Sequence, residues 1–461
     1  MAQHKDLVIL LPGITGSVLA NRSGKEVWAP SVGAAWRALT SLGKSITGLE
    51  LAADDADDGV VATRLVPDVS IVPGLIKLDG YTRIAESLCK RLELEEGKNF
   101  RAFPYDWRRD NRRTAAALDS QAMDWLNHWR AESGNSKAKL VLVGHSMGGL
   151  ISRWFVECLG GWQHTRALVT LGTPHRGALN AVGFIENGMK KGIGPFGLDL
   201  SPLLRSFTSV YQLLPIYPCI DAGGPTQRVA DAARAGLLTH MNADRATAAR
   251  AFHQQIIDAQ AANAKTDAYA ASGYTMVPIV GTEQPTAQSA QVANGRCTLV
   301  NSLGGQDLAG DGTVPRASAT PVDMEGAKRE VYAAETHGSI QNNDGTLANL
   351  VGLLTADRID WRRFQRAADL ASLTLDLADD VLLAGESLQV RARASEGSPK
   401  LNARLQSLAD GTDVDEPLQR DSARGEGWMA GEFKLPPGTW RVTVHGSGVA
   451  PVSDLVVVAE A

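Results

Sequence analysis

Short apolar runs alternate with amphipathic stretches over the first three-quarters of the chain. Residues 81–92 and 118–129 repeat apolar side chains at helical spacing, so each stretch presents one apolar face. Strand-like runs that alternate with helices predict an α/β fold with a mainly parallel sheet covered by helices. The predicted strands are Leu7–Leu11, Phe100–Phe103, Leu140–Val143, Leu168–Leu171, Val277–Val280 and Val331–Ala334.

Residues from about 177 to 275 interrupt this alternation. They contain a glycine-rich stretch, an apolar segment that includes Leu203, Phe207 and Leu213, and an alanine-rich helical segment. We expect this part to be an insertion above the sheet. A cap that packs permanently on the core and a mobile lid that opens an apolar pocket are both compatible with it. Its apolar side chains also leave open a peripheral contact between the lid and a membrane.

The pattern changes after residue 369 to short alternating strands, such as Ser387–Ala394 and Thr439–Val444, separated by Gly, Pro and Asp turns. This change predicts a β-sandwich domain over residues 369–461, which follows a first domain over residues 1–368. Because no flexible linker lies near the boundary, we expect the two domains to pack together. Nothing in the sandwich looks catalytic. We interpret it as a stabilising or docking unit, with binding of a protein or surface partner as the alternative.

Composition narrows the class of protein. The 461 residues are 44% hydrophobic and 21% charged, as is typical of soluble globular proteins. The formal net charge of −5 provides no basic field, so nucleic-acid binding is not expected. The N-terminus lacks the features of a secretory signal, and no apolar run reaches the roughly eighteen residues of a transmembrane helix. With four widely spaced cysteines, these features predict a cytoplasmic protein, although export by a route without a recognisable signal stays compatible with the sequence.

The segment from Leu140 to Leu150 carries the first candidate for chemistry. A buried-strand run is followed by Gly-His-Ser-Met-Gly and then by the start of an apolar helix, which predicts a strand, a sharp turn and a helix. Glycines two positions before and after the serine have no Cβ atom, so strand and helix can approach closely and expose the serine hydroxyl. Ser146 is therefore the candidate nucleophile.

A serine nucleophile requires an imidazole that takes its proton and a carboxylate that holds the imidazole. In a sheet of this kind, both follow the serine in the chain, the acid first and the histidine second. His337 follows the predicted strand 331–334 directly and is the candidate base, whereas His445 lies inside the predicted sandwich. Asp311, in the tight loop Gly-Asp-Gly-Thr-Val-Pro, is the candidate acid, with Asp307 as the competitor.

The oxyanion of an acyl-transfer intermediate requires fixed N–H donors, each of which stabilises the transition state by roughly 3 kcal/mol. The residue after the nucleophile, Met147, supplies one donor by the geometry of the turn. The second is expected from the loop after the first strand. We assign it to Ile14, because Gly13 allows the backbone to turn the next amide toward the pocket. A plain Gly/Pro turn is the alternative for this loop.

Taken together, these segments resemble the lecithin:cholesterol acyltransferase-like family of α/β-hydrolases. The resemblance covers about residues 5–360 and implies an α/β-hydrolase fold, Ser146, Asp311 and His337 as the triad, and Ile14 and Met147 in the oxyanion hole. It also implies acyl esters, often of lipids, as substrates. The secreted animal members have signal peptides and disulfide-tied lids, which are not visible here, so lipoprotein substrates are not implied. The matching motifs are LLPGITGS, FPYDWRRD, VGHSMGG, LGTPHRG, GDGTVP and THGSI.

The main hypothesis is a serine carboxylester hydrolase that acts on lipid-like acyl esters through an acyl-enzyme on Ser146. An acyltransferase, which passes the acyl group to an alcohol, and a peptidase or amidase share the same machinery. A binding or scaffold protein that keeps the fold without catalysis is the alternative of another class. No cofactor is expected, because serine chemistry requires no metal and no metal-ligating pattern occurs. A structural calcium ion stays compatible with the sequence.

Overall fold

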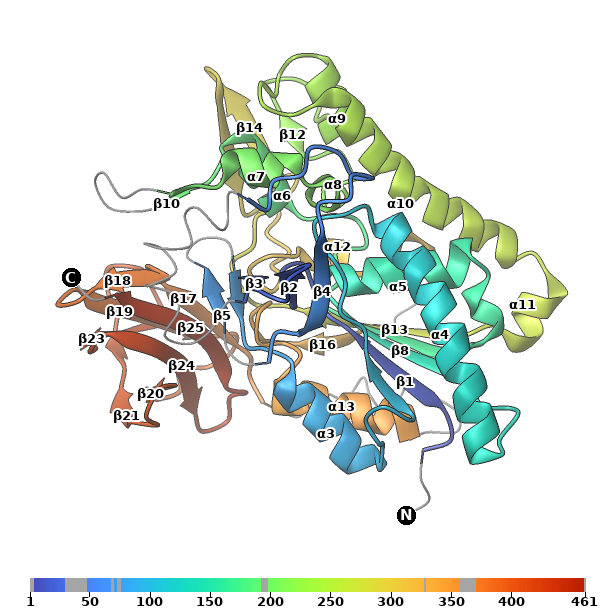
Figure 1. The fold of residues 1–461 in the computed structure, drawn as a ribbon. Helices are drawn as coiled ribbons and strands as arrows, with labels where there is room; N and C mark the ends of the chain where they lie inside the picture. Colours follow the sequence, from blue (N-terminus) through green and yellow to red (C-terminus); the bar gives the residue numbers. More distant parts are fainter. Residues whose placement is uncertain are drawn as a thin grey trace.

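A parallel sheet forms the centre of the molecule in the computed structural model, which describes residues 4–29, 48–67, 70–72, 76–191, 198–326, 329–355 and 370–459. Within these residues the sheet has six strands in the order β16-β13-β9-β8-β1-β7, and all neighbouring pairs are parallel. The predicted fold class is confirmed (Figure 1). The strands are β1 (Leu7–Leu11), β7 (Phe100–Ala102), β8 (Leu140–His145), β9 (Thr165–Leu171), β13 (Thr275–Gly281) and β16 (Val331–Ala333).

Side chains of the sheet are buried on both faces, which explains why its strands are continuous apolar runs rather than alternating ones. In β1, Leu7 and Ile9 belong to the core on the side of α4 and α5, whereas Val8 and Leu10 belong to the core on the side of α3 and α13. The covering helices of these two layers are α3 (Thr82–Leu92), α4 (Asn111–Ser133), α5 (Met147–Cys158) and α13 (Asp344–Thr355).

The chain between β9 and β13 forms a group of helices above the carboxyl ends of the strands (Figure 1). The short helices α7 and α8 place apolar side chains toward the sheet, and the long helix α10 packs against α5. Part of the predicted insertion, residues 192–197, lies outside the described residues. The helices are α6 (Leu179–Glu186), α7 (Ser201–Ser206), α8 (Thr208–Tyr211), α9 (Val229–Arg234), α10 (Ala243–Asn263) and α11 (Asp267–Ser272).

Smaller elements surround the open end of the sheet. One group of three antiparallel strands follows β1, and a second three-stranded sheet stands near the inserted helices. These elements are β2 (Ser17–Asn21), β3 (Glu26–Trp28), β4 (Val60–Leu65), β5 (Ser70–Val72), β6 (Ile76–Leu78), β10 (Lys190–Lys191), β11 (Leu198–Asp199), β12 (Ile220–Asp221), β14 (Ser289–Ala293), β15 (Arg296–Val300) and α12 (Arg316–Ala319).

The C-terminal part consists of two β-sheets that enclose a separate apolar core. One sheet has the order β17-β19-β23-β22 and the other β18-β25-β24-β20-β21. The predicted boundary near residue 368 lies outside the described residues. The strands are β17 (Leu373–Leu377), β18 (Val381–Leu383), β19 (Ser387–Ala394), β20 (Leu401–Ser407), β21 (Asp413–Pro417), β22 (Gln419–Arg420), β23 (Trp428–Lys434), β24 (Gly438–Gly446) and β25 (Val452–Ala459).

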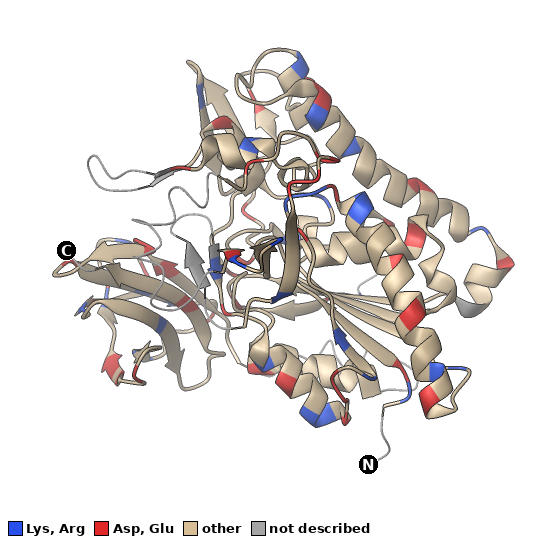
Figure 2. Cartoon of the chain, viewed as in Figure 1, with Lys and Arg blue, Asp and Glu red and all other residues tan. Residues whose placement is uncertain are grey.

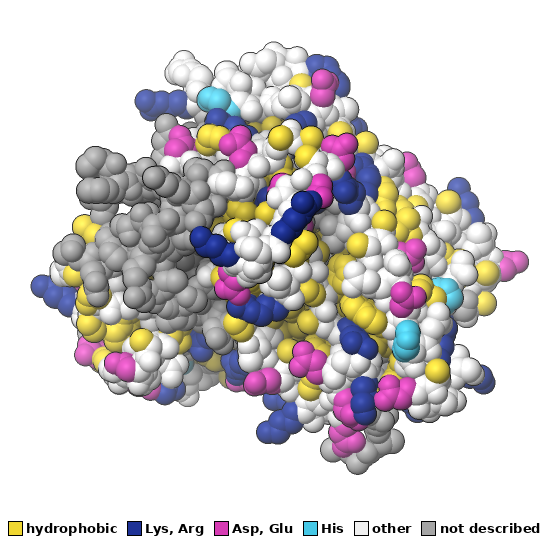
Figure 3. All heavy atoms as spheres, viewed as in Figure 1, with side chains coloured by type: hydrophobic (Ala, Val, Ile, Leu, Met, Phe, Trp, Pro, Cys, Tyr) yellow, Lys and Arg dark blue, Asp and Glu magenta, His cyan; other side chains and the backbone are white. Residues whose placement is uncertain are grey.

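Acidic and basic residues are interspersed along the chain and over the face of the molecule in view (Figures 2 and 3). No single-sign region that would attract a polyanion stands out there. Among the described helices, none has the length and apolar character needed to cross a membrane.

Candidate active site

Ser146 lies at the apex of a sharp turn between β8 and α5, with backbone angles of φ 51° and ψ −123°. This left-handed region is unfavourable for a residue with a side chain, and the tight surroundings maintain it. A Cβ atom on Gly148 would lie 2.5 Å from the carbonyl oxygen of Pro12, and one on Gly149 would lie 2.0 Å from Oγ1 of Thr173. The glycines of the motif therefore allow contacts that any larger residue would prevent.

The structure brings the three predicted triad residues into one hydrogen-bonded series. The Oγ–H of Ser146 donates to Nε2 of His337 over 2.9 Å, and Nδ1–H of His337 donates to Oδ2 of Asp311 over 2.7 Å. The directions follow because an ionised carboxylate can only accept, which leaves Nε2 as the acceptor. This arrangement can transfer a proton from the serine hydroxyl to the imidazole.

The surroundings of Asp311 hold its carboxylate in place. Its side chain is buried, and Oδ1 accepts from the amides of Thr313 and Val314 over 3.0 and 2.7 Å. The backbone of His337 also donates to the carbonyl oxygen of Asp311 over 2.8 Å. Two glycines make room for this pair, since a Cβ on Gly172 would lie 2.8 Å from Oδ2 and one on Gly281 would lie 2.3 Å from Cβ of Asp311.

The two competing residues lie elsewhere. Asp307 accepts from the side chain of Gln288 and the amide of Ala309, and thus forms part of a turn. His445 lies on β24 and contacts the carboxylate of Asp415 in the sandwich. Neither of the two forms a hydrogen bond with Ser146 or His337 in the described part of the chain.

The two predicted oxyanion donors come from two different segments of the chain. Met147 is the first residue of α5, and Ile14 lies in the loop after β1. Within the described residues, no hydrogen bond uses the amide of either residue, and Ile14 lines the cavity that contains Ser146. These amides are thus free to donate to a ligand.

Two residues that the sequence analysis did not identify, Tyr81 and His145, connect the loop after β1 with the candidate base His337. His145 donates Nε2–H to the carbonyl oxygen of His337 over 3.1 Å, so its Nδ1 accepts from the hydroxyl of Tyr81 over 2.8 Å. The Tyr81 oxygen in turn accepts from the amide of Gly13 over 2.7 Å. Burial, together with the nearby His337, lowers the pKa of His145 to about 3, which keeps its ring neutral as this chain of donors requires.

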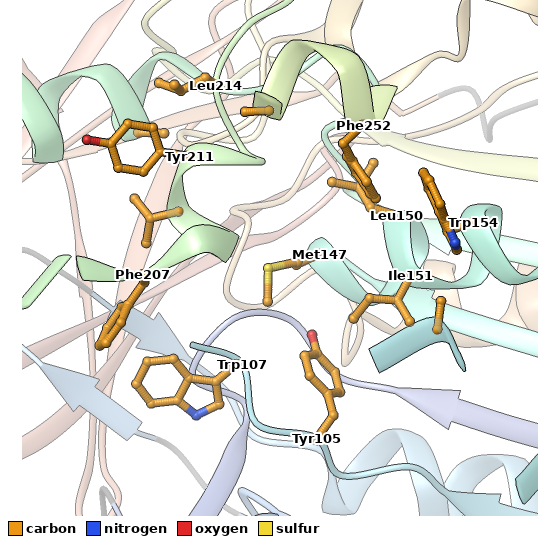
Figure 4. Packing of buried hydrophobic residues seen from close by; sticks show 14 of the residues in the cluster. Tyr105, Trp107, Met147, Leu150, Ile151, Trp154, Phe207, Tyr211, Leu214 and Phe252 are labelled. Carbon is orange, nitrogen blue, oxygen red and sulfur yellow. The ribbon is translucent and has the colours of Figure 1, made fainter. Parts of the chain in front are cut away.

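A cavity of about 610 Å³ opens beside Ser146, His337 and Asp311. Its side toward the inserted helices is apolar, and the rings of Trp107 and Phe207 meet there edge to face with centroids 5.6 Å apart. Figure 4 shows Met147 near Tyr105 and Trp107, with Phe207 on the far side of the Trp107 ring. The apolar lining consists mainly of Trp28, Trp107, Leu203, Leu204, Phe207 and Leu213.

Comparisons with solved structures return lipases and phospholipases at low sequence identity. The mature form of lipase BlEst2 from Bacillus licheniformis aligns with 77% of this chain and 94% of its own, at 14% identity and a TM-score of 0.34. Phospholipase PlaB from Legionella pneumophila aligns with 98% of this chain and 92% of its own, at 10% identity and a TM-score of 0.32. The comparison with curated proteins returns no match.

The sequence model of lecithin:cholesterol acyltransferase matches residues 74–278. This range contains Ser146 and the inserted helices, whereas Ile14, Asp311 and His337 lie outside it. The match supports a lipid ester hydrolase or acyltransferase. The family resemblance predicted from the motifs is thereby confirmed: over residues 74–278 the chain matches the lecithin:cholesterol acyltransferase family.

Proposed function

We propose that this protein is a serine carboxylester hydrolase that cleaves esters of apolar acyl groups through an acyl-enzyme on Ser146. The observation that carries the proposal is the series Ser146–His337–Asp311, with distances of 2.9 and 2.7 Å, beside an apolar cavity. The family match over residues 74–278 supports the same class of reaction.

In the proposed reaction, His337 accepts the proton of Ser146 as Oγ attacks the ester carbonyl carbon. The amides of Met147 and Ile14 donate to the oxyanion that forms, and Asp311 stabilises the charged imidazole. His337 then protonates the departing alcohol. Water, activated by the same imidazole, attacks the acyl-enzyme, releases the carboxylic acid and regenerates the serine.

The apolar side of the cavity supports an aliphatic acyl chain as the group that binds there. A cavity of about 610 Å³ lies in the range of small-molecule sites, which are typically about 300–1,000 Å³. Leucine and aromatic side chains exclude water from the acyl chain of the substrate. Each acyl methylene group that is buried there stabilises the bound state by about 0.8 kcal/mol. The ratio kcat/KM should therefore rise with acyl length until the cavity is filled.

The test measures hydrolysis of 4-nitrophenyl esters of increasing acyl length by the wild type, Ser146→Ala and Ser152→Ala. Ser152 is a matched control, since it is buried six residues further along the chain, in α5, and donates to the carbonyl oxygen of Gly148. We expect Ser146→Ala to lose at least about a thousandfold in kcat and Ser152→Ala to stay near wild type. Equal turnover by Ser146→Ala would refute the assignment.

A fluorophosphonate probe separates catalysis from a purely structural role of the fold. The proposal expects covalent labelling of the wild type at Ser146 and none of Ser146→Ala. Lack of labelling in the folded wild type would favour a scaffold protein. Product analysis with a mixed lipid substrate, with and without a long-chain alcohol, distinguishes the released fatty acid from a transferred ester and so tests hydrolysis against acyl transfer.

A further inference from the structure

The loop that carries His337 contacts the C-terminal sandwich directly, and the loop that carries Asp311 is connected to it through Gln284. Their contacts involve two different strands, β17 and β25, and pass through the buried side chains of Gln284 and Glu335 and the half-buried side chain of Thr336. Nothing in the proposed reaction uses these side chains directly. The contacts of these side chains with the sandwich therefore require a separate explanation.

Gln284 connects the acid loop to β17. Its backbone forms paired hydrogen bonds with Gly310, the residue before Asp311. Its side chain, which is 1% exposed, donates to the carbonyl oxygen of Leu373 over 2.9 Å and accepts from the amide of Leu375 over 3.0 Å. The Gln284 side chain therefore satisfies backbone groups at the free edge of β17 that a neighbouring strand would otherwise bond.

The base loop is held by β25 in a comparable way. The carboxylate of Glu335 accepts from the amide of Ser453 over 3.0 Å, and the hydroxyl of Thr336 donates to the carbonyl oxygen of Ser453 over 2.8 Å. Thr336 directly precedes His337. One sandwich residue therefore supplies both a donor and an acceptor to the two residues before the candidate base.

The sandwich also closes one side of the active-site cavity. Leu375 and Leu377 of β17 are among the residues that line it, together with residues of the inserted helices. Beside them, the ammonium group of Lys77 contacts Asp380 over 2.6 Å and Asp454 over 2.8 Å, which ties the segment next to the base loop to the sandwich. Strand β17 therefore both lines the cavity and, through its hydrogen bonds with Gln284, holds the loop that carries Asp311.

We propose that the β-sandwich is a positioning element of the active site, which fixes the acid loop through Gln284 and the base loop through Glu335 and Thr336. This proposal rests on the proposed function. Proton transfer is sensitive to displacements of a fraction of an ångström in the reacting groups. Because Asp311 and His337 lie on separate loops, a rigid body that is bonded to both keeps their distance constant.

Thr336→Val tests the contact nearest to the base, because valine keeps the shape of threonine and removes the hydroxyl. We expect kcat to fall about tenfold while KM changes less than about twofold, measured well below the unfolding temperature. Thr336→Ser retains the hydroxyl and should recover most of kcat. The rate of fluorophosphonate labelling should follow kcat in all these variants.

Thr443→Val is the matched control, since Thr443 forms a hydrogen bond with the hydroxyl of the same Ser453 within the sandwich. It makes the same chemical change without touching either loop and should keep wild-type kcat. Gln284→Met removes both bonds to β17 and tests the acid loop independently. We expect a loss of kcat similar to or greater than that of Thr336→Val, in a protein whose folding is verified by circular dichroism.

The proposal is overturned if folded Thr336→Val and Gln284→Met both keep wild-type kcat, or if Thr443→Val loses as much kcat as Thr336→Val. The wild type and Ser146→Ala are assayed in the same series. A wild type without esterase activity or labelling would refute the proposed function instead. An active wild type with unaffected loop variants would refute the positioning role alone.

Discussion

The hydroxyl of Tyr81 connects the loop that carries the proposed oxyanion donor Ile14 with His145, which is bonded to the candidate base His337. It accepts from Gly13, beside the proposed oxyanion donor, and donates to His145, which in turn donates to the backbone of His337. Each group in this series has its partner, and burial favours the uncharged forms of both rings. Tyr81 and His145 are positioning residues, because neither forms a hydrogen bond with Ser146.

Tyr81→Phe removes one donor and one acceptor from this buried series. The amide of Gly13 and Nδ1 of His145 both lose their partner, which should lower the free energy of unfolding by about 1–3 kcal/mol. Because the loop after β1 then loses its anchor, we expect kcat to fall by about tenfold or more with little change in KM. Steady-state kinetics and chemical denaturation measure the two effects.

Tyr105→Phe provides the control for the Tyr81 substitution. Tyr105 is buried like Tyr81 and donates to the carbonyl oxygen of Pro12, in the same loop, but has no bond to His145. We expect a comparable loss of stability and a smaller loss of kcat. If the two variants lose kcat equally, the connection through His145 has no special role.

The candidate triad residues could be predicted because each lies in a local pattern. A glycine-flanked serine follows a strand, an aspartate lies between glycines, and a histidine directly follows a strand. Tyr81 and Gln284 carry no such signal, and His145 occupies a position that the G-x-S-x-G pattern leaves open. Their hydrogen bonds connect residues that are 64 to 192 positions apart, so their roles become visible only when the chain is folded.

At the scale of elements, the turn between β8 and α5 brings three segments close together. Gly148 packs against the carbonyl oxygens of Pro12 and Leu11, at the end of β1. This contact sets the distance between the start of α5 and the loop after β1, from which the proposed oxyanion donors come. The glycine is therefore required for the shape of the site as well as for the turn.

Gly148→Ala should separate these two segments. The added Cβ would lie 2.5 Å from the oxygen of Pro12 and 2.8 Å from that of Leu11, and both are backbone atoms that can move only with the loop. We expect a loss of stability of about 1–3 kcal/mol and a fall in kcat of at least about a hundredfold. Thermal unfolding and ester hydrolysis measure these effects.

Gly224→Ala is the control for the added methyl group. A Cβ at Gly224 would meet no atom within 4 Å, and its backbone lies outside the left-handed region. Stability and kcat should both stay near wild type. A Gly148→Ala variant that behaved the same way would show that the loop after β1 adapts freely and that the close contact is unimportant.

The sequence predicts well those elements whose pattern of buried side chains is visible along the chain. Strand β1 and residues Leu140–Val143 of β8 are buried on both faces and are continuous apolar runs, and the six predicted strands of the sheet are present. The helices between β9 and β13 could be predicted only as a group. Helices as short as α7 and α8 span fewer than two turns, which is too short for a helical repeat to appear.

At the scale of the whole molecule, the sequence distinguishes two parts but not how they pack. The change from long helices to short alternating strands predicts the sandwich, whose core contains only its own residues. The contacts of Gln284, Glu335 and Lys77 with it connect residues that are far apart in the chain. Isolated polar residues are common along the chain, so the burial of Gln284 and Glu335 between two units could not be predicted from the pattern.

The burial of Glu335 between the catalytic part and the sandwich should make the free energy of unfolding depend on pH. Desolvation raises the pKa of Glu335 to about 7, with Asp454 acting in the same direction, although Ser453, Thr336 and Asn343 donate to the carboxylate. In the unfolded chain the pKa is near the ordinary 4.5. Between these values the folded state binds more protons than the unfolded state, so stability falls as the pH rises.

Glu335→Gln should remove this dependence, because glutamine does not titrate. Between pH 5 and pH 7.5, we expect the wild type to lose about 2 kcal/mol in the free energy of unfolding relative to the variant. The amide of glutamine also faces Asn343, whose oxygen is already bonded to Gly345 and Thr346, so the variant should be less stable by a constant amount. The decisive quantity is therefore the difference in slope, measured by urea unfolding at several pH values. Parallel slopes would mean that Glu335 stays ionised in the folded protein, held by its three donors against the effect of burial.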